Sequence, residues 1–436
     1  MVNVRKRGKV FEYRFEIATV DGARKWVTKS GFTKKSDALM EGAKAYNDFM
    51  YNGKKVQLQG NMSYSDFLDY WIDTYANFNL HYSTIVCYMN IIKVHLKPKI
   101  GYYKLCQLDV RLLQEFVNKL YVDNAFSKNY MSSILKVIKG SLKYACYTLN
   151  YINFDPAEHV HIPRLDRINK DPAHIFTKEE IERILNRFKG THSIYYAFLT
   201  AYYTGMRVSE VYGLTWDCVD FERKTITINK NIIKKNQYGL PKRKNVTKGH
   251  SVGIWYYGDC KNPQSRRTIP IGDTLVNALK NYKQEQEENR KFYGDSYFCY
   301  YEKRVINEIT NREEIKLIEA KAELGLSLPE ARLVFVKENG SFMGTDSPRY
   351  AFKVIHYELG INCRFHDFRD THATRLVENG ADIKAVSKRL GHSTIMTTYN
   401  IYVRVTNKME YDTVDKFEDY TNTLDIPNPV DIPEQD

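Results

Sequence analysis

The apolar residues between Tyr64 and Tyr151 recur at the spacing of helical faces, and this pattern restricts that stretch to a helical domain. Pro98 and Gly101 interrupt the pattern once. We expect these apolar side chains to form a core and to carry no chemistry of their own. They are Phe67, Leu68, Trp71, Ile72 and Tyr75; Ile91, Ile92, Val94 and Leu96; Leu112, Leu113, Phe116, Val117 and Leu120; and Ile134, Leu135, Ile138, Leu142 and Ala145.

The first 57 residues have a different pattern and carry 13 basic and 6 acidic residues. Apolar and polar side chains alternate from Phe11 to Phe15, and Asp21-Gly22 marks a turn before the next strand, so a hairpin is predicted. A helix is expected from about Ser36 to Met50, with Ser36 as its N-cap. This region is therefore predicted to be a small basic sheet with one helix.

A further domain follows a proline-marked linker at about residues 155–172. It opens with a capping box, Thr177 to Glu180, which indicates the start of a helix. The fold class predicted for the whole chain is mainly α, in several domains, with a small sheet or hairpin in the last one. The expected elements are helices to about Leu214, strands at 225–228 and 267–271, long charged helices at 277–330, and helices again to about Tyr402.

The chain is basic, and its charge is unevenly distributed. Residues 409–436 hold nine acidic side chains and one lysine, so residues 1–408 carry 64 basic and 43 acidic residues, a net charge of +21. Residues 229–258 contain seven Lys and Arg and no Asp or Glu. Such a surface favours a polyanionic partner, because neutralising phosphates releases counterions.

Other classes of protein are disfavoured by what the sequence lacks. No run approaches 18 uninterrupted apolar residues, and the start has no apolar signal core, so a protein of the cell interior is expected. The seven scattered cysteines include no CxxC pair, which indicates neither a disulfide framework nor a cysteine zinc site.

Chemistry-bearing residues fall in four separate segments. Arg207 follows a glycine turn in Thr204-Gly205-Met206-Arg207-Val208-Ser209-Glu210. Lys261 precedes Asn262-Pro263-Gln264-Ser265-Arg266-Arg267-Thr268-Ile269-Pro270. His366 and Arg369 belong to His366-Asp367-Phe368-Arg369-Asp370-Thr371-His372-Ala373-Thr374, and His392 stands in Leu390-Gly391-His392-Ser393, ten residues before Tyr402.

Together these residue types suit phosphodiester chemistry. His366 and Arg369, three residues apart, lie on one helix face. Two guanidinium groups offer paired donors that match the non-bridging oxygens of a phosphate, and they would stabilise the transition state without a metal. A phenol can attack phosphorus to form a covalent intermediate, and a lysine can protonate the departing oxygen.

The order of these segments resembles the tyrosine recombinase (phage integrase) family, above all the integrases of conjugative transposons and of temperate phages of Gram-positive bacteria. TGMRVSE resembles the first box of the family, HDFRDTHAT the second and LGHSTIMTTYNIY the third. The resemblance covers nearly the whole chain. It implies an arm-type DNA-binding domain with a three-stranded sheet and a helix at 1–57, a helical SAM-like core-binding domain at 62–160, a catalytic domain at 172–407 and an acidic tail at 408–436 that docks on a neighbouring subunit.

The resemblance also implies a role for each residue. Arg207 and Arg369 would bind the scissile phosphate, and His392 would donate a hydrogen bond to it. Lys261, in a β-hairpin, would protonate the leaving 5′-oxygen, and His366 would assist proton transfer at the nucleophile. Tyr402 would form a 3′-phosphotyrosyl link. The remaining assignments are Glu210 as the support of Arg207, and Lys242, Arg243, Lys244, Arg5 and Arg7 as DNA contacts.

The implied activity is site-specific integration and excision of a mobile element through a Holliday junction. Its partners would be double-stranded DNA with core-type and arm-type sites, three further copies of the chain in a homo-tetramer, and accessory excision or DNA-bending proteins. No cofactor, metal or membrane is implied, and the expected location is the bacterial cytoplasm, at the nucleoid when bound.

Several alternatives stay open at this point. Tyr399 lies seven residues after His392 and competes with Tyr402, while Lys244 or Lys248 competes with Lys261. His372 is interpreted as a packing residue. The segment 229–258 is either a solvated loop or an extended hairpin along the DNA backbone.

Three other functions compete with this interpretation. A DNA-binding regulator without activity would not need all six catalytic positions filled. A metal phosphohydrolase with His366, Asp367 and His372 as ligands leaves Arg207 and Tyr402 without roles. A type IB topoisomerase uses similar chemistry but needs no arm-binding domain.

Overall fold

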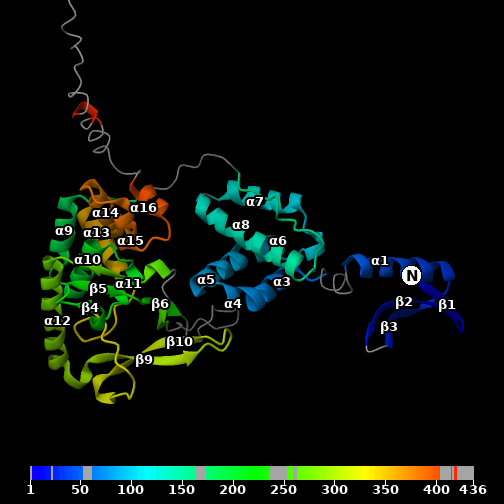
Figure 1. Cartoon of the computed structure of the whole chain (residues 1–436), viewed down its shortest axis with the longest axis horizontal. Coiled ribbons are helices and arrows are strands. Elements are labelled where there is room, and N and C mark those ends of the chain that lie inside the picture. Colours follow the sequence, from blue (N-terminus) through cyan, green and yellow to red (C-terminus); the bar gives the residue numbers. More distant parts are fainter. Residues whose placement is uncertain are drawn as a thin grey trace, which may run out of the picture. The chain divides into compact units, whose positions relative to one another are not determined.

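The computed structural model describes residues 2–20, 23–52, 61–124, 126–163, 173–235, 253–258, 263–402, 414 and 417–419. The chain divides into two units, Met1–Lys170 and Asp171–Asp436, which are described separately (Figure 1). The fold is mainly helical, with small antiparallel sheets. None of the helices in these ranges is long and apolar enough to cross a membrane.

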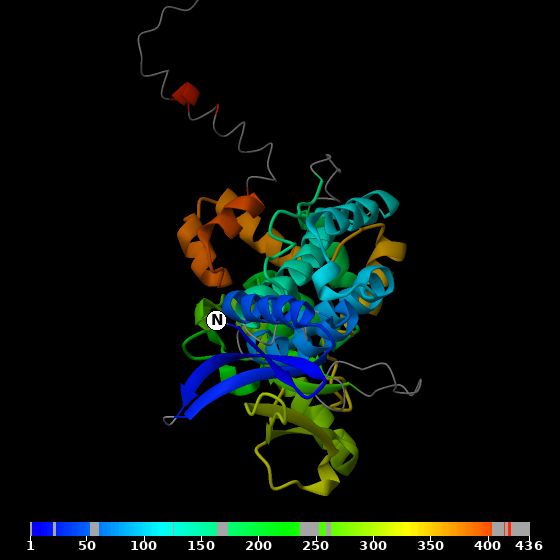
Figure 2. The ribbon, with the colours of Figure 1, turned by 90° about the vertical axis from the view of Figure 1, so that its right-hand side faces the viewer.

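The first unit opens with a three-stranded sheet in the order β1-β2-β3, and α1 lies across one of its faces (Figure 2). Tyr13 and Phe15, at alternate positions of β2, are buried, and the Phe15 ring meets Tyr46 of α1 edge-on at 5.4 Å between ring centres. The close approach leaves no room for a side chain at Gly42 of α1, where a Cβ would lie 2.9 Å from Tyr13. The bounds are β1 Asn3–Arg7, β2 Val10–Val20, β3 Ala23–Phe32 and α1 Lys35–Asn52.

The rest of the first unit is helical, as the periodicity predicted, and encloses an apolar core. Val94 was expected in that core, but its side chain is 49% exposed and lies outside it. Ser63, Asp109 and Ser127 cap three of its helices by accepting a hydrogen bond from a backbone N–H of the first turn. The α-helices are α3 Tyr64–Trp71, α4 Asn77–Asn79, α5 Tyr82–Ile91, α6 Lys97–Ile100, α7 Val110–Asp123 and α8 Lys128–Lys143, with wide π turns at Ile72–Ala76, Ile92–Leu96 and Tyr144–Thr148.

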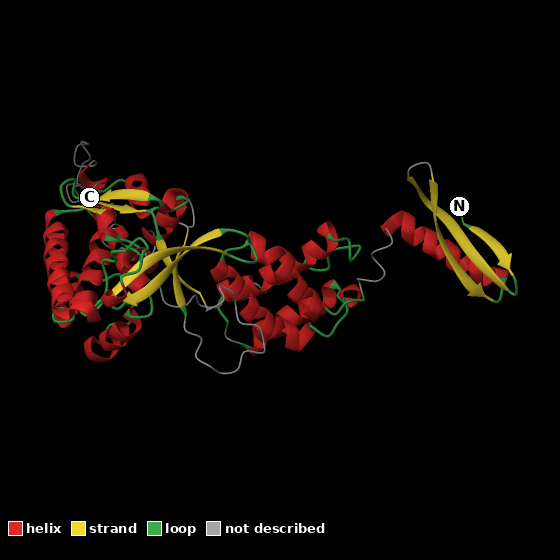
Figure 3. Cartoon of the chain, turned by 90° about the horizontal axis from the view of Figure 1, so that it is seen from below, coloured by secondary structure: helices red, strands yellow, loops and turns green. Residues whose placement is uncertain are grey.

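The second unit is built on helices that surround a larger apolar core. Figure 3 draws the helices of both units in red. The predicted capping box is present: Thr177 accepts from the backbone N–H of Glu180, and the Glu180 carboxylate accepts from that of Thr177. The helices are α9 Lys178–Phe188, α10 His192–Thr204, α11 Val208–Tyr212, α12 Asp273–Tyr293, α13 Pro348–Leu359, α14 Phe365–Glu378, α15 Ile383–Leu390 and α16 Ile395–Tyr402.

Two antiparallel sheets complete the second unit, in the orders β4-β5-β8 and β6-β7-β10-β9. Their strands are yellow in Figure 3. β5 pairs with β8 and β6 pairs with β7, so the chain runs outward along β5 and β6 and returns along β7 and β8. The strands are β4 Val219–Asp220, β5 Thr225–Ile228, β6 Asn231–Lys235, β7 Ile254–Gly258, β8 Arg267–Pro270, β9 Phe298–Ile306 and β10 Glu313–Lys321.

The prediction of long charged helices across residues 277–330 is wrong beyond α12. That helix ends at Tyr293, and a hairpin of β9 and β10 follows it. Its turn includes Asn311 at φ 51°, a backbone conformation that asparagine tolerates better than most residues. β10 pairs with β9 on one side and with β7 on the other, so strand pairing overrides the helical propensity of its Glu, Lys and Ala residues.

Candidate active site

The first box is shaped by a glycine that ends α10 in the left-handed conformation. Gly205 has φ +65°, and a Cβ there would lie 2.5 Å from Leu390 and 2.9 Å from the His372 ring. Only glycine fits this close approach to α14 and α15. The turn places Arg207 at the N-cap of α11.

Arg207 is held by two contacts and stays partly open to solvent. Its Nη1 donates to Glu210 Oε1 at 2.6 Å and its Nη2 to the Gly391 carbonyl at 3.3 Å, while 34% of its side chain is exposed. Glu210 is only 3% exposed. Burial alone would raise the pKa of Glu210, but hydrogen bonds and charges from Arg267 and Arg207 outweigh it and lower that pKa.

Arg369 of α14 is almost completely buried, at 1% exposure. Its Nη1 donates to the Gly205 carbonyl and its Nη2 to the Leu390 carbonyl, both at 2.7 Å. Its Nε has no hydrogen-bond partner among the described residues. Burial, and next the nearby Arg207, lower the pKa of Arg369 to about 9, so the guanidinium stays charged at neutral pH.

Two histidines lie beside these arginines. His392 follows the end of α15, and its Nδ1 lies 2.8 Å from Thr398 Oγ1. Burial, then Arg369 and Arg207, lower the pKa of His392 to about 3, so the ring is neutral at physiological pH. His366 lies in the first turn of α14, 3.7 Å from the Asp370 carboxylate.

The pKa of His366 is affected by the charged groups around it. Partial burial lowers the pKa of His366, Asp370 opposes that shift, and Arg369 and Arg207 add to it. The same two arginines act on His392. The structure thus brings Arg207, Arg369, His366 and His392 together from segments up to 185 positions apart.

Tyr402 is the last residue of α16, which packs against α14 and α15, but its side chain lies outside the described residues. Tyr399, on the same helix, is 46% exposed. Lys261, between β7 and β8, also lies outside the described residues. The same holds for four basic residues between β6 and β7: Lys242, Arg243, Lys244 and Lys248.

The described ends of the basic segment 229–258 form paired strands, β6 and β7, and the three described lysines in or beside β6 form ion pairs within the second unit. Lys230 pairs with Glu302 at 2.9 Å, Lys235 with Glu314 at 2.6 Å, and Lys234 with Asp346 at 3.0 Å. Lys230 and Lys235 are 26% and 10% exposed, whereas Lys234 is 45% exposed and stays partly open to solvent.

Arg267 is a residue of the site to which the sequence interpretation gave no role. It donates to both oxygens of Glu210, at 2.9 and 3.3 Å, to the Arg389 carbonyl at 2.7 Å and to the Ser265 carbonyl at 3.0 Å. It therefore ties the support of Arg207 to the end of α15. A signal was available: Arg267 alternates with Ile269 and Ile271, which places a charge on the buried face of a strand.

His372 packs in the interior and takes no part in the cluster. Its Nδ1 donates to the Tyr202 carbonyl at 2.8 Å, and its Nε2 accepts from Arg389 Nε at 3.1 Å. Burial, then the charge of Arg389, lower the pKa of His372 to about 4. The Asp367 carboxylate accepts hydrogen bonds from the backbone N–H and the guanidinium of Arg364. The described ranges contain no group of three side chains suited to a metal ion.

In the first unit, Arg5 and Arg7 of β1 flank the Glu12 carboxylate of β2 at 2.5 and 3.5 Å. Their side chains are 54% and 74% exposed, so both remain open to a ligand. Glu12 itself is covered.

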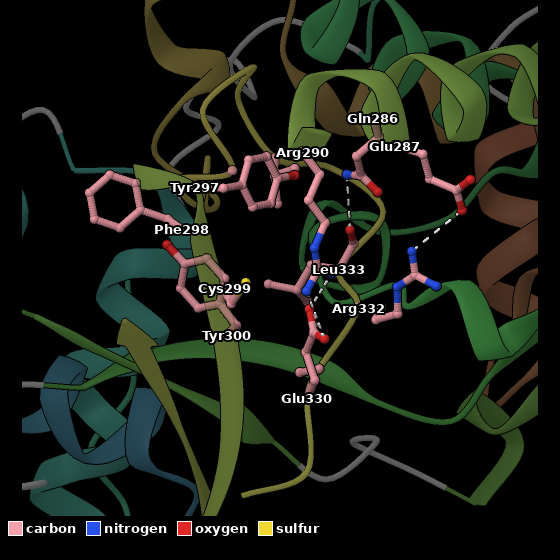
Figure 4. A pocket seen from close by; sticks show the side chains of 13 residues that line it. Gln286, Glu287, Arg290, Tyr297, Phe298, Cys299, Tyr300, Glu330, Arg332 and Leu333 are labelled. Atoms are coloured by element: carbon pink, nitrogen blue, oxygen red, sulfur yellow. Dashed lines mark hydrogen bonds and ion pairs between the residues drawn. The ribbon is translucent and has the colours of Figure 1, made fainter. Parts of the chain in front are cut away.

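A hollow elsewhere in the second unit carries no comparable cluster (Figure 4). It lies between α12, the start of β9 and residues 330–340, and its charged side chains are paired with one another. Arg290 binds Glu330 at 2.7 Å, Arg332 reaches Glu287 at 3.5 Å, and Gln286 donates to the Leu333 carbonyl. We assign it a structural role.

Known proteins resemble this chain in sequence and in structure. Residues 174–409 match the phage integrase family, and residues 63–121 match its N-terminal SAM-like domain. A "Tyrosine recombinase XerC-like" protein of Caldanaerobacter subterraneus subsp. tengcongensis is 27% identical over 96% of this chain and 98% of its own length. The "Integrase" of Staphylococcus phage L54a is 24% identical over 72% of this chain and 80% of its own.

Solved structures share the fold. The Tn1549 transposon integrase in complex with a circular intermediate DNA aligns with a TM-score of 0.59 and 17% identity, covering 82% of this chain and 99% of that one. A lambda integrase tetramer bound to a Holliday junction aligns with a TM-score of 0.51 and 12% identity, covering 92% and 94%. At these identities the likeness establishes the fold.

Proposed function

Because this chain belongs to the phage integrase family and is a tyrosine-type site-specific recombinase, we propose that it integrates and excises a mobile element by cutting and rejoining DNA through Tyr402. The observation that carries the residue assignments is the position of Arg207 and Arg369. Arg207 belongs to the first box and Arg369 to the second. Each donates a hydrogen bond to a backbone carbonyl just before His392, Arg207 to that of Gly391 and Arg369 to that of Leu390.

The two arginines would bind the non-bridging oxygens of the scissile phosphate. Arg207 is partly exposed, and Arg369 keeps one buried N–H without a described partner. Charged donors that are already held in place stabilise the charge of a phosphoryl transition state at little reorganisation cost. A neutral His392 would add one further donor through Nε2.

Proton transfer would accompany each displacement. The Tyr402 oxygen attacks phosphorus while His366 takes the phenolic proton, and the bond from phosphorus to the 5′-oxygen breaks. Lys261 protonates that oxygen as it leaves. The product is a 3′-phosphotyrosyl link, and attack by a 5′-hydroxyl of the partner strand reverses the steps, so that a Holliday junction forms and resolves.

The other parts of the chain have proposed roles in DNA binding and assembly. Residues 1–57 would bind arm-type sites through Arg5 and Arg7, and residues 62–160 would bind the core site. The catalytic domain, 172–407, would add backbone contacts from Lys242, Arg243 and Lys244. The assembly would be a homo-tetramer on double-stranded DNA in the bacterial cytoplasm, with excision or DNA-bending proteins as accessory partners and without a metal.

The acidic tail, residues 408–436, would dock on a neighbouring subunit. Val414 of this tail is 56% exposed in the single chain. Deletion of residues 409–436 should alter assembly or the coupling between active sites. Unchanged recombination and unchanged oligomer size would contradict this role.

Covalent trapping tests the proposed chemistry. A duplex selected from a random-sequence library for binding to the full-length chain is nicked beside the cleaved phosphate, so that the cut strand cannot rejoin. The wild type should form a denaturation-resistant adduct in EDTA, Tyr402→Phe should form none, and Tyr399→Phe should retain it. An adduct that survives in Tyr402→Phe would move the nucleophile elsewhere. Strand exchange between two duplexes then separates recombination from DNA relaxation alone.

A further inference from the structure

One hydrogen bond connects the third box to the helix that carries the proposed nucleophile. His392 Nδ1 lies 2.8 Å from Oγ1 of Thr398, whose side chain is fully buried. Thr398 belongs to α16 and lies four residues, about one helical turn, before Tyr402. The contact therefore spans the loop between α15 and α16.

The direction of this hydrogen bond determines what the rest of the ring can do. A neutral imidazole has one N–H and one acceptor nitrogen, whereas a hydroxyl has a single proton to donate. If the hydroxyl donates to Nδ1, its proton is satisfied and the ring proton resides on Nε2. If Nδ1 donates instead, the buried hydroxyl proton needs another acceptor, and His392 Nδ1 is the partner that the described residues give it.

The surroundings of the ring favour the first arrangement. Arg369 and Arg207 lie close enough to lower the pKa of His392, so the ring binds a single proton there. Only the tautomer with that proton on Nε2 can donate to an anion bound by the same arginines. The other tautomer would present a lone pair to the phosphate oxygen.

We propose that Thr398 is a positioning residue: its hydroxyl donates to His392 Nδ1, keeps the ring proton on Nε2 for the scissile phosphate, and ties the helix of Tyr402 to the phosphate site. The inference rests on the proposed function. Thr398 acts through His392 and need not touch the DNA itself.

Two substitutions separate the hydroxyl from the shape of the side chain. Thr398→Val keeps the branched shape and removes the donor, whereas Thr398→Ser keeps the donor and removes a methyl group. With the selected nicked duplex bound at saturation, Thr398→Val should form the covalent adduct about tenfold more slowly, and Thr398→Ser should stay within about twofold of the wild type. DNA affinity should change little in either.

A double-mutant cycle tests whether the effect acts through the histidine. Glutamine at position 392 has an amide donor that needs no tautomer, so adding Thr398→Val to His392→Gln should slow cleavage by less than about twofold. A full tenfold loss in that background would overturn the proposal, as would equal losses for the valine and serine variants.

A direct reading of the proton completes the test. In the full-length chain labelled with ¹⁵N-histidine, the His392 signal, assigned by its loss in His392→Gln, should show a protonated Nε2 and an unprotonated Nδ1. Protonation at Nδ1 would overturn the inference and leave the proposed function standing. A wild type that forms no Tyr402-dependent adduct would instead defeat the proposed function, and the positioning role with it.

Discussion

Replacing Arg267 by methionine should destabilise the second unit by about 3 kcal/mol. Removing one partner of a buried ion pair costs about 3–5 kcal/mol, because the other charge is left uncompensated. The Arg267 and Glu210 side chains are 6% and 3% exposed, so solvent screening reduces this value little. Glu210 keeps Arg207 as a second cation at 2.6 Å, which places the cost at the lower end of the range.

Arg267→Lys should recover only part of the loss. An ammonium group keeps the charge, but it cannot contact both Glu210 oxygens and also reach the Arg389 and Ser265 carbonyls. With one or two hydrogen bonds missing, the remaining cost is about 1–2 kcal/mol. Adduct formation should slow as well, because Glu210 holds Arg207.

Urea unfolding followed by hydrogen-exchange mass spectrometry gives the measurement, since peptides from α10 and α12 report the second unit separately from the first. The matched control is Arg332→Met, whose ion pair with Glu287 at 3.5 Å is about half exposed and should contribute less than about 1 kcal/mol. A loss below about 1 kcal/mol for Arg267→Met would refute the reasoning. So would a cycle with Glu210→Gln in which the two losses simply add.

Three further predictions concern cleavage, DNA binding and pH. Lys261→Ala should block cleavage of ordinary DNA, and cleavage by this variant should recover on DNA with a 5′-bridging sulfur, a leaving group that needs no proton. If Lys244→Ala or Lys248→Ala shows this block and recovery instead, that lysine is the general acid. Neutralising Lys242, Arg243 and Lys244 should lower the slope of log K against log salt by up to about 3 if all three bind phosphates, and an unchanged slope would mean a solvated loop. The free energy of unfolding should fall as the pH drops from about 6.5 toward 4. Histidines of the unfolded chain take up protons in this range, while folded His372 and His392, with pKa values of about 4 and about 3, do not. His392→Gln should weaken this pH dependence, and an unchanged profile in that variant would contradict the prediction.

The sequence predicted the helical elements best, because their signals are local. Apolar spacing located α7 and α8, and the capping box placed the start of α9 one residue after Thr177. The strands β9 and β10 were missed although they pair with each other in a local hairpin; only the second pairing of β10, with β7, spans more than 50 residues. Their charged, helix-favouring residues gave the opposite local signal.

Within the site, motif order located the boxes but could not supply the contacts between them. No spacing rule relates Arg369 to the Gly205 carbonyl, or His392 to Thr398, because those distances follow from how α10, α14, α15 and α16 pack. The role of Arg267 was readable in part, from a charge on the buried face of a strand. Its bonds to Glu210 and to the Arg389 carbonyl required the fold.

The end of α15 explains why these contacts converge. Three consecutive carbonyls there accept from three arginines: Arg389 O from Arg267, Leu390 O from Arg369 and Gly391 O from Arg207. The last carbonyls of a helix lack partners within it and carry partial negative charge, so they suit guanidinium groups that would otherwise repel one another. Gly391, at φ +69°, also leaves room for Arg267, whose Nη1 would lie 3.1 Å from a Cβ. A phosphate entering this site would therefore meet arginines whose mutual repulsion is already offset by fixed dipoles, which is the preorganisation that rapid phosphoryl transfer requires.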